Sequence, residues 1–260
     1  MNKFENLNLI RSESRPTGKD LVTQLFPDFE ELKGDRLYGE DPAIICGIAT
    51  LFDMPVTVVA QNKGNNFEER IENNFGMAHP EGYRKAERMF KLAEKFKRPV
   101  ITIIDTAGAY PGIESEERGQ ASSIASCLMT LSDLSVPIVS IILSEGGSGG
   151  ALALAHSDYM YCFSKAYYSV ISPEGYAEIL YKSQKSVEEI IDDLPIFATN
   201  LTELGVVDKI IEEPEDGISM PLDEVYAFDL QKDLFDCIKS LSKKNIKAHR
   251  YERFRKYGRK

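Results

Sequence analysis

The chain has 260 residues, of which 43% are hydrophobic and 28% charged, and its formal net charge is −10 at pH 7. This length can bury one large core or two small ones, and the acidic balance argues against a general nucleic-acid surface. No apolar run is long enough to cross a membrane, and the first residues are not typical of a signal peptide. The four cysteines lie far apart without a C-x-x-C pair, which predicts no zinc ribbon and no disulfide framework and fits a cytoplasmic protein.

The first part of the chain, to about residue 35, is predicted to be a helical segment. After a polar start, Leu21, Leu25 and Phe26 suggest a short helix that is interrupted near Pro27. This segment leads into the first strands.

Residues 43–49 and 55–60 are β-branched runs joined by a turn near Asp53, which predicts a hairpin. Residues 63–82 are polar and rich in Asn and Gly, so we expect a loop or lid with at most one helical turn. Apolar residues then recur at helical spacing and predict a helix: Ala86, Met89, Phe90, Ala93 and Phe96.

Two segments of the middle region share one order of elements: helix, proline, apolar strand, glycine turn. Residues 99–105 form the first strand and 136–142 the second, and the acidic residues Glu114, Glu116 and Glu117 open the helix between them. Strands that are buried on both faces and separated by a helix predict a parallel α/β sheet with right-handed crossovers. Because parallel strands end at one edge, the two glycine turns are expected to converge on one pocket.

The last third is predicted to hold short elements. Residues 159–163 and 168–172 suggest strands, Pro173 begins a helix, 186–204 is a helical region broken by Pro195, and 205–211 is an edge strand.

An acidic linker then leads to a basic C-terminal helix over about residues 225–260. We interpret that end as solvated or bound to an acidic partner rather than to nucleic acid. No composition change marks a boundary, so residues 1–260 are predicted to form a single domain.

The second glycine turn, Gly146 to Gly150, separates an apolar strand from a helix-prone segment. Glycine lets the backbone approach a ligand closely, and the first N–H groups of a helix have no partner within it. Such a turn can stabilise a developing oxyanion, although a tight packing turn would have the same sequence.

Other chemistries fit the sequence less well. Ser148 lies in a G-x-S-x-G pattern typical of a nucleophile elbow. The base is missing, however: His156 is poorly placed on the same helix, His249 is in the basic end, and His79 in the polar loop stays open. No Lys-Ser/Thr follows the glycines, which excludes a P-loop, and no ligand spacing predicts a metal site.

Two carboxylates, Asp105 and Glu145, each stand at the end of a predicted core strand beside a glycine turn. They could face each other and transfer protons. The alternative, which we favour, is that they accept hydrogen bonds and hold the turns in place.

Several ordered motifs resemble the carboxyltransferase alpha subunit of bacterial acetyl-CoA carboxylase. The resemblance covers about residues 21–213 and is carried by these segments: 28–36 (DFEELKGDR), 104–112 (IDTAGAYPG), 116–120 (EERGQ), 145–153 (EGGSGGALA) and 168–175 (YSVISPEG). It implies an α/β fold of the crotonase/ClpP-like class, a spiral of ββα units. This chain also departs from the family pattern, which often has a proline at the position of Ala107. The change could loosen the first loop.

The resemblance also implies a reaction and its partners. The family transfers a carboxyl group from carboxybiotin, held on a biotin carboxyl carrier protein, to acetyl-CoA and so forms malonyl-CoA, the committing step of fatty acid synthesis. A beta subunit is implied as the partner in an α2β2 enzyme and is expected to carry the zinc, whereas this chain would hold no metal. A biotin carboxylase partner would use ATP.

Site residues are carried over by the same resemblance. Biotin-side donors would be the backbone amides of Gly108 and Ala109 in the first loop and of Gly146 and Gly147 in the second. The residues lining the cofactor site would be Tyr110, Pro111, Gly112, Ser148 and Gly149.

Three alternatives stay open besides a Ser148 hydrolase. The chain could serve another acyl-CoA carboxylase or decarboxylase, since such subunits would share these loops. It could be an enoyl-CoA hydratase or isomerase with Glu145 or Glu117 as base, or a scaffold with a relict pocket.

Overall fold

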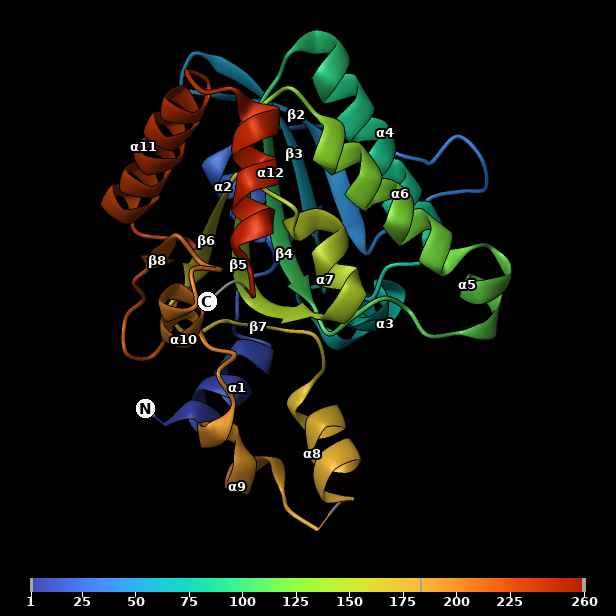
Figure 1. Ribbon diagram of the computed structural model, residues 1–260, viewed down its shortest axis with the longest axis vertical. Coiled ribbons are helices and arrows are strands. Elements are labelled where there is room, and N and C mark those ends of the chain that lie inside the picture. The colour runs from blue at the N-terminus through green and yellow to red at the C-terminus, as the bar shows by residue number, and fades with distance from the viewer. Residues whose placement is uncertain (1, 183, 259–260) are drawn as a thin grey trace.

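The structure, a computed structural model, describes residues 2–182 and 184–258. They form a mixed eight-stranded sheet in the order β1-β2-β3-β4-β5-β6-β8, with β7 paired to β5 (Figure 1). The strand β1 pairs antiparallel with β2 and β2 with β3, while the pairs from β3 onward are parallel. The strands are β1 Glu30–Glu31, β2 Ile44–Leu51, β3 Met54–Gln61, β4 Val100–Thr106, β5 Ile138–Gly147, β6 Tyr159–Phe163, β7 Tyr167–Ser169 and β8 Lys209–Ile211.

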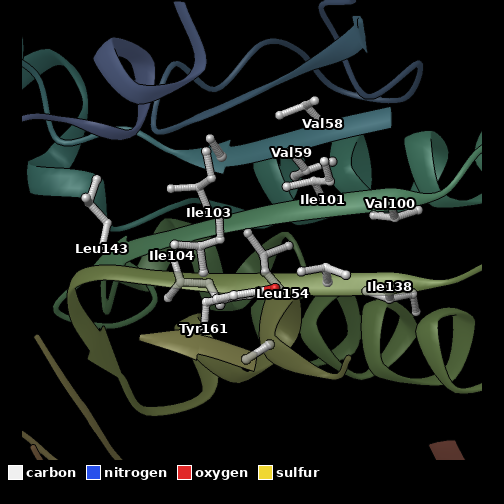
Figure 2. Packing of buried hydrophobic residues seen from close by; sticks show 14 of the residues in the cluster. Val58, Val59, Val100, Ile101, Ile103, Ile104, Ile138, Leu143, Leu154 and Tyr161 are labelled. Carbon is white, nitrogen blue, oxygen red and sulfur yellow. The ribbon is translucent and has the colours of Figure 1, made fainter. Parts of the chain in front are cut away.

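The central strands confirm the predicted hairpin and the predicted parallel sheet. Every residue of β4 and β5 is buried, because helices cover both faces. Figure 2 shows the apolar side chains of β3, β4 and β5 together with Leu154 of α7. The helices are α1 Lys3–Arg11, α2 Gly18–Leu25, α3 Phe67–Glu72, α4 Pro80–Phe96, α5 Ile113–Glu117, α6 Gln120–Asp133, α7 Ser148–Ala155, α8 Pro173–Tyr181, α9 Val187–Ile190, α10 Ala198–Glu203, α11 Glu224–Leu241 and α12 Ile246–Lys256, with the 3₁₀ turns η1 Asn74–Gly76 and η2 Ile191–Asp193.

Two predictions about the middle of the chain were wrong. Residues 63–82 contain more helix than expected, because Asn66 caps α3 by accepting a hydrogen bond from the amide of Glu69, and η1 and the start of α4 follow. The helix expected after the first glycine turn is divided into α5 and α6. The break falls at Gly119, whose φ of 86° cannot continue an α-helix.

Helix α1 lies within the N-terminal segment that was predicted to be helical, although the only helix placed by individual residues there was the one at Leu21, Leu25 and Phe26, which is α2. Asn2 and Glu5 form a capping box at its N-terminus, and its buried residues Leu7 and Ile10 pack with Tyr167 in a small second apolar cluster. In Figure 1, α1, α8 and α9 lie at the lower end of the molecule, beyond β7. The shorter elements of the last third otherwise lie close to their predicted positions, and β8 is the expected edge strand.

The basic C-terminal end was predicted as one helix but contains two, α11 and α12. It is not simply solvated, because Arg250 of α12 is only 1% exposed and forms an ion pair with buried Asp158. The predicted basic residues Arg259 and Lys260 lie outside the described residues.

Candidate active site

The two glycine loops meet where β4 and β5 end. A Cβ at Gly147 would lie 2.0 Å from the carbonyl oxygen of Ala107, and a Cβ at Gly150 would lie 2.5 Å from the amide nitrogen of Ala109. Only glycine permits backbones to approach this closely. The predicted convergence of the two turns is therefore confirmed.

In the first loop, one amide is left available between two that are used. The amide of Gly108 donates to Thr106 Oγ1 at 3.1 Å, and that of Tyr110 donates to the carbonyl of Ala78 at 3.1 Å. Between them, the N–H of Ala109 makes no hydrogen bond to another described residue. Among the amides of residues 108–110, that of Ala109 is therefore the one without a hydrogen-bond partner in the described chain.

A side chain from α6 holds this conformation. Gln120 is buried, and its Nε2 donates to the carbonyls of Ala78 and Tyr110 at 2.8 and 3.0 Å. The rest of the loop, Pro111 and Gly112, leads directly into α5.

In the second loop, the predicted donors Gly146 and Gly147 lie inside β5, opposite Tyr168 and Ser169 of β7. Helix α7 begins at the next residue, Ser148, which has a left-handed φ of 55°. The first N–H groups of an α-helix have no intrahelical partner, and here no side chain caps them either.

The predicted lining residues lie on an open surface. Pro111 and Ser148 are exposed, and Tyr110, Gly112 and Gly149 are partly exposed. Five cavities of about 310 to 540 Å³ are lined by other parts of the described chain and by no residue of these loops.

A buried ion cluster lies beneath the loops. Lys63 Nζ is 2.8 Å from Asp105 Oδ1 and 2.5 Å from Glu145 Oε2, and the amide of Glu145 donates to Asp105 Oδ1 at 3.2 Å. The two carboxylates do lie together as predicted, but both are bound to a lysine. This geometry supports the turn-holding role and leaves neither carboxylate free to act as a base.

The cluster extends toward the small apolar cluster around α1. Arg11 Nε donates to Glu145 Oε1 at 2.7 Å, and the hydroxyl of Tyr167 donates to the same oxygen at 3.0 Å. The guanidinium of Arg11 also donates twice to Glu174 at the start of α8. Glu145 therefore joins the second loop to α1 and α8.

Burial acts on the two carboxylates of the cluster with different results. It raises the pKa of Asp105, against the opposing effect of Lys63. For Glu145, burial is outweighed by Lys63 and Arg11 together, and the pKa falls from 4.5 to about 2. Glu145 therefore stays ionised and accepts hydrogen bonds from its neighbours.

This shift predicts how stability depends on pH. Because the folded-state pKa of Glu145 is depressed, its ion pairs stabilise the fold above pH 4.5, and that stabilisation is lost as the pH falls toward 2. We expect Glu145→Gln to lower the free energy of unfolding at neutral pH by about 2 kcal/mol. Calorimetric melting across this pH range should show a flatter pH dependence for the variant than for the unmodified chain, and equal slopes would contradict the assignment.

Sequence reasoning missed Lys63, Arg11 and Tyr167. Only Lys63 had a usable signal, since it lies just beyond the second strand of the predicted hairpin. Arg11 is 134 residues from Glu145 in sequence, and nothing local indicates the pairing.

The hydrolase hypothesis for Ser148 lacks a base in the structure. The strand, turn and helix around the serine do match an elbow, but its hydroxyl makes no hydrogen bond to a described residue. His79 Nδ1 pairs with Ser115 Oγ at 2.6 Å, His156 contacts Ser132, and His249 contacts the carbonyl of Asp158.

Among residues 2–182 and 184–258, no group of three or more His, Cys, Asp or Glu side chains is arranged to hold a metal ion. No helix in that part of the chain combines the length and apolar character needed to span a bilayer.

Comparisons with known proteins agree with the sequence motifs. A family model described as acetyl co-enzyme A carboxylase carboxyltransferase-like matches residues 1–258. The acetyl-coenzyme A carboxylase carboxyl transferase subunit alpha of Clostridium botulinum (strain Eklund 17B / Type B) is 48% identical over 261 residues, which cover 98% of this chain and 94% of the relative. A protein of Natranaerobius thermophilus, named as subunits beta/alpha of the same enzyme, is 44% identical over 264 residues, covering 98% of this chain and 43% of its own.

Solved structures support the fold. Transcarboxylase 12S with methylmalonyl-coenzyme A and methylmalonic acid bound has a TM-score of 0.73 and 18% identity, over 92% of this chain and 45% of that chain. At this identity the likeness concerns the fold alone, and it confirms the expected crotonase-like α/β class.

Proposed function

The chain belongs to the acetyl-CoA carboxylase carboxyltransferase family, and we propose that it is the alpha subunit that transfers a carboxyl group from carboxybiotin to acetyl-CoA. The product is malonyl-CoA, the first committed intermediate of fatty acid synthesis. The observation that carries the proposal is the backbone-to-backbone contact of the two glycine loops at Gly147 and Gly150. This contact supports the proposal because it brings peptide groups, rather than ionisable side chains, together where β4 and β5 end.

These residues suit a biotin-side oxyanion site. Carboxybiotin on a partner protein would supply the carboxyl group, and the amides of these loops would stabilise the negative charge that its ureido oxygen gains in the transfer. We assign the free N–H of Ala109 as the donor of the first loop. The amide of Gly108 supports this loop by donating a hydrogen bond to Thr106 Oγ1. In the second loop, Gly146 and Gly147 directly precede α7. The start of this helix has no side-chain cap and lies beside the Ala109 amide. A fixed amide donor of this kind is typically worth several kcal/mol of transition-state stabilisation.

Lining roles follow from the same placement. Tyr110, Pro111 and Gly112 flank the first donor, and Ser148 and Gly149 flank the second, all with some exposure to solvent. A carrier-bound biotin could therefore approach from outside the chain.

The open surface suggests that a second subunit completes the site. A relative that joins beta and alpha in one chain supports a beta subunit as this partner. We propose an α2β2 enzyme in which the beta subunit binds most of the acetyl-CoA and carries the zinc. The biotin carboxyl carrier protein and an ATP-using biotin carboxylase would supply carboxybiotin, and residues 1–260 would act as one cytoplasmic carboxyltransferase domain.

The test is the reverse reaction. The chain mixed with a beta subunit should convert malonyl-CoA to acetyl-CoA in the presence of biocytin, while either subunit alone should be inactive. A panel of acyl-CoA substrates would separate an acetyl-CoA enzyme from a related carboxylase or decarboxylase. Absence of turnover in an assembled complex would refute the proposal.

The role of Ser148 gives a separate prediction. Since its hydroxyl has no base beside it, we expect Ser148→Ala to keep at least about one tenth of the turnover, whereas loss of a serine nucleophile costs about 10⁶-fold. Labelling of Ser148 by a fluorophosphonate probe, together with a loss on that scale, would favour the hydrolase instead.

A further inference from the structure

Lys63 stands where both glycine loops leave the sheet. Its ammonium contacts Asp105, the next-to-last residue of β4, and Glu145, which directly precedes Gly146 in β5. One side chain from the segment just after β3 thus joins the base of the first loop to the base of the second.

The regular β4–β5 pairing is interrupted at this point. Ile104 lies opposite Ile142, but Thr106 lies opposite Gly146, so residues 143–145 face Asp105 alone. A bulge of this kind removes ladder hydrogen bonds locally. Because the ladder is interrupted there, side chains add to the connection between the two strand ends, and the Lys63 ion pairs are one such link.

Gln61, near Lys63 at the end of β3, makes a second link between the loops. Its Oε1 accepts a hydrogen bond from the amide of Asp105 at 3.1 Å, and its Nε2 donates to the carbonyl of Gly150 at 2.9 Å. The end of β3 is thus tied to both loops by two neighbouring side chains.

A buried ion cluster is an inefficient way to stabilise a fold, because apolar residues of similar volume are often as good or better. The side chains of Lys63, Asp105 and Glu145 are nevertheless only 10%, 2% and 6% exposed. We propose that Lys63 is a positioning residue for the carboxyl transfer, setting the distance between the Ala109 amide and the amides of the second loop. This inference rests on the proposed function.

The first experiment compares Lys63→Met with a matched loss of another buried ion pair. In the complex with the beta subunit, we expect Lys63→Met to lower kcat by about 10- to 100-fold, because small displacements of catalytic groups are costly. The KM for malonyl-CoA should change less than about 3-fold, since the beta subunit is proposed to hold that substrate. The control is Arg250→Met, whose partner Asp158 accepts a hydrogen bond from Ile138 at the opposite end of β5. Below its melting temperature it should keep kcat within about 2-fold.

The double variant Lys63→Met/Asp105→Asn separates positioning from charge balance. The Asp105→Asn substitution removes the carboxylate that Lys63→Met leaves unpaired. Thermal stability should therefore recover relative to Lys63→Met, while kcat stays low. Recovery of kcat together with stability would overturn the proposal, as would a folded, assembled Lys63→Met enzyme with unchanged kcat.

Amide hydrogen exchange tests the same idea without the reaction. In the alpha chain alone, peptides covering residues 105–112 and 143–150 should exchange faster in Lys63→Met than in Arg250→Met. Equal exchange in the two variants would refute the positioning role. If the unmodified complex lacks carboxyltransferase activity, the proposed function fails, while this measurement still decides whether Lys63 holds the loops.

Discussion

Replacement of Gly147 by alanine is expected to lower kcat by at least about 100-fold, the cost of losing one oxyanion donor. The added Cβ would lie 2.0 Å from the carbonyl oxygen of Ala107 and 2.4 Å from its carbonyl carbon. Both are backbone atoms and cannot rotate away, so one loop has to move. The measurement is malonyl-CoA decarboxylation by the assembled complex, below the melting temperature of the variant.

Two other glycines serve as controls for this change. A Cβ at Gly149 meets only side-chain atoms of Ile124, the nearer at 3.9 Å, so Gly149→Ala should fold with an unchanged or slightly raised melting temperature. A Cβ at Gly39 meets nothing within 4 Å, so Gly39→Ala should keep both stability and turnover. Wild-type turnover in Gly147→Ala would show that the close contact of the loops does not matter for the reaction.

Replacement of Arg250 by methionine is expected to lower the free energy of unfolding by about 3 to 5 kcal/mol, because it leaves a buried carboxylate unpaired. Arg250 Nη2 is 2.6 Å from Asp158 Oδ2, and the two side chains are 1% and 0% exposed. The guanidinium also donates to the carbonyls of Leu131, Leu134 and Val136 at 2.7, 2.8 and 3.0 Å. It therefore fastens α12 to the connection between α6 and β5.

For a chain of this size, the melting temperature should fall by about 10 °C in a calorimetric scan. Arg255→Met is the matched control, since Arg255 lies exposed in the same helix, and it should change stability by no more than about 0.5 kcal/mol. Equal melting temperatures for Arg250→Met and Arg255→Met would show that the buried pair adds nothing to the fold.

Local sequence patterns were enough to predict the central elements. The apolar runs of β4 and β5 and the helical spacing of α4 are each contained in a short segment, because strand and helix periodicity depend on neighbours in the chain. Breaks that depend on the conformation of one residue were predicted less well. The division at Gly119 between α5 and α6 and the capping of α3 by Asn66 are examples.

The sequence by itself determined that two glycine turns follow parallel strands, and it led to the prediction that their backbones rather than their side chains face the reaction. Only the tertiary structure decided what holds those turns. Lys63 and Glu145 are 82 residues apart, and Arg250 and Asp158 are 92 residues apart. Their pairing depends on how the strands are ordered in the sheet and on where α12 packs. A charged residue in a polar stretch gives no local sign of burial, because its desolvation and its partner are both created by the folded chain.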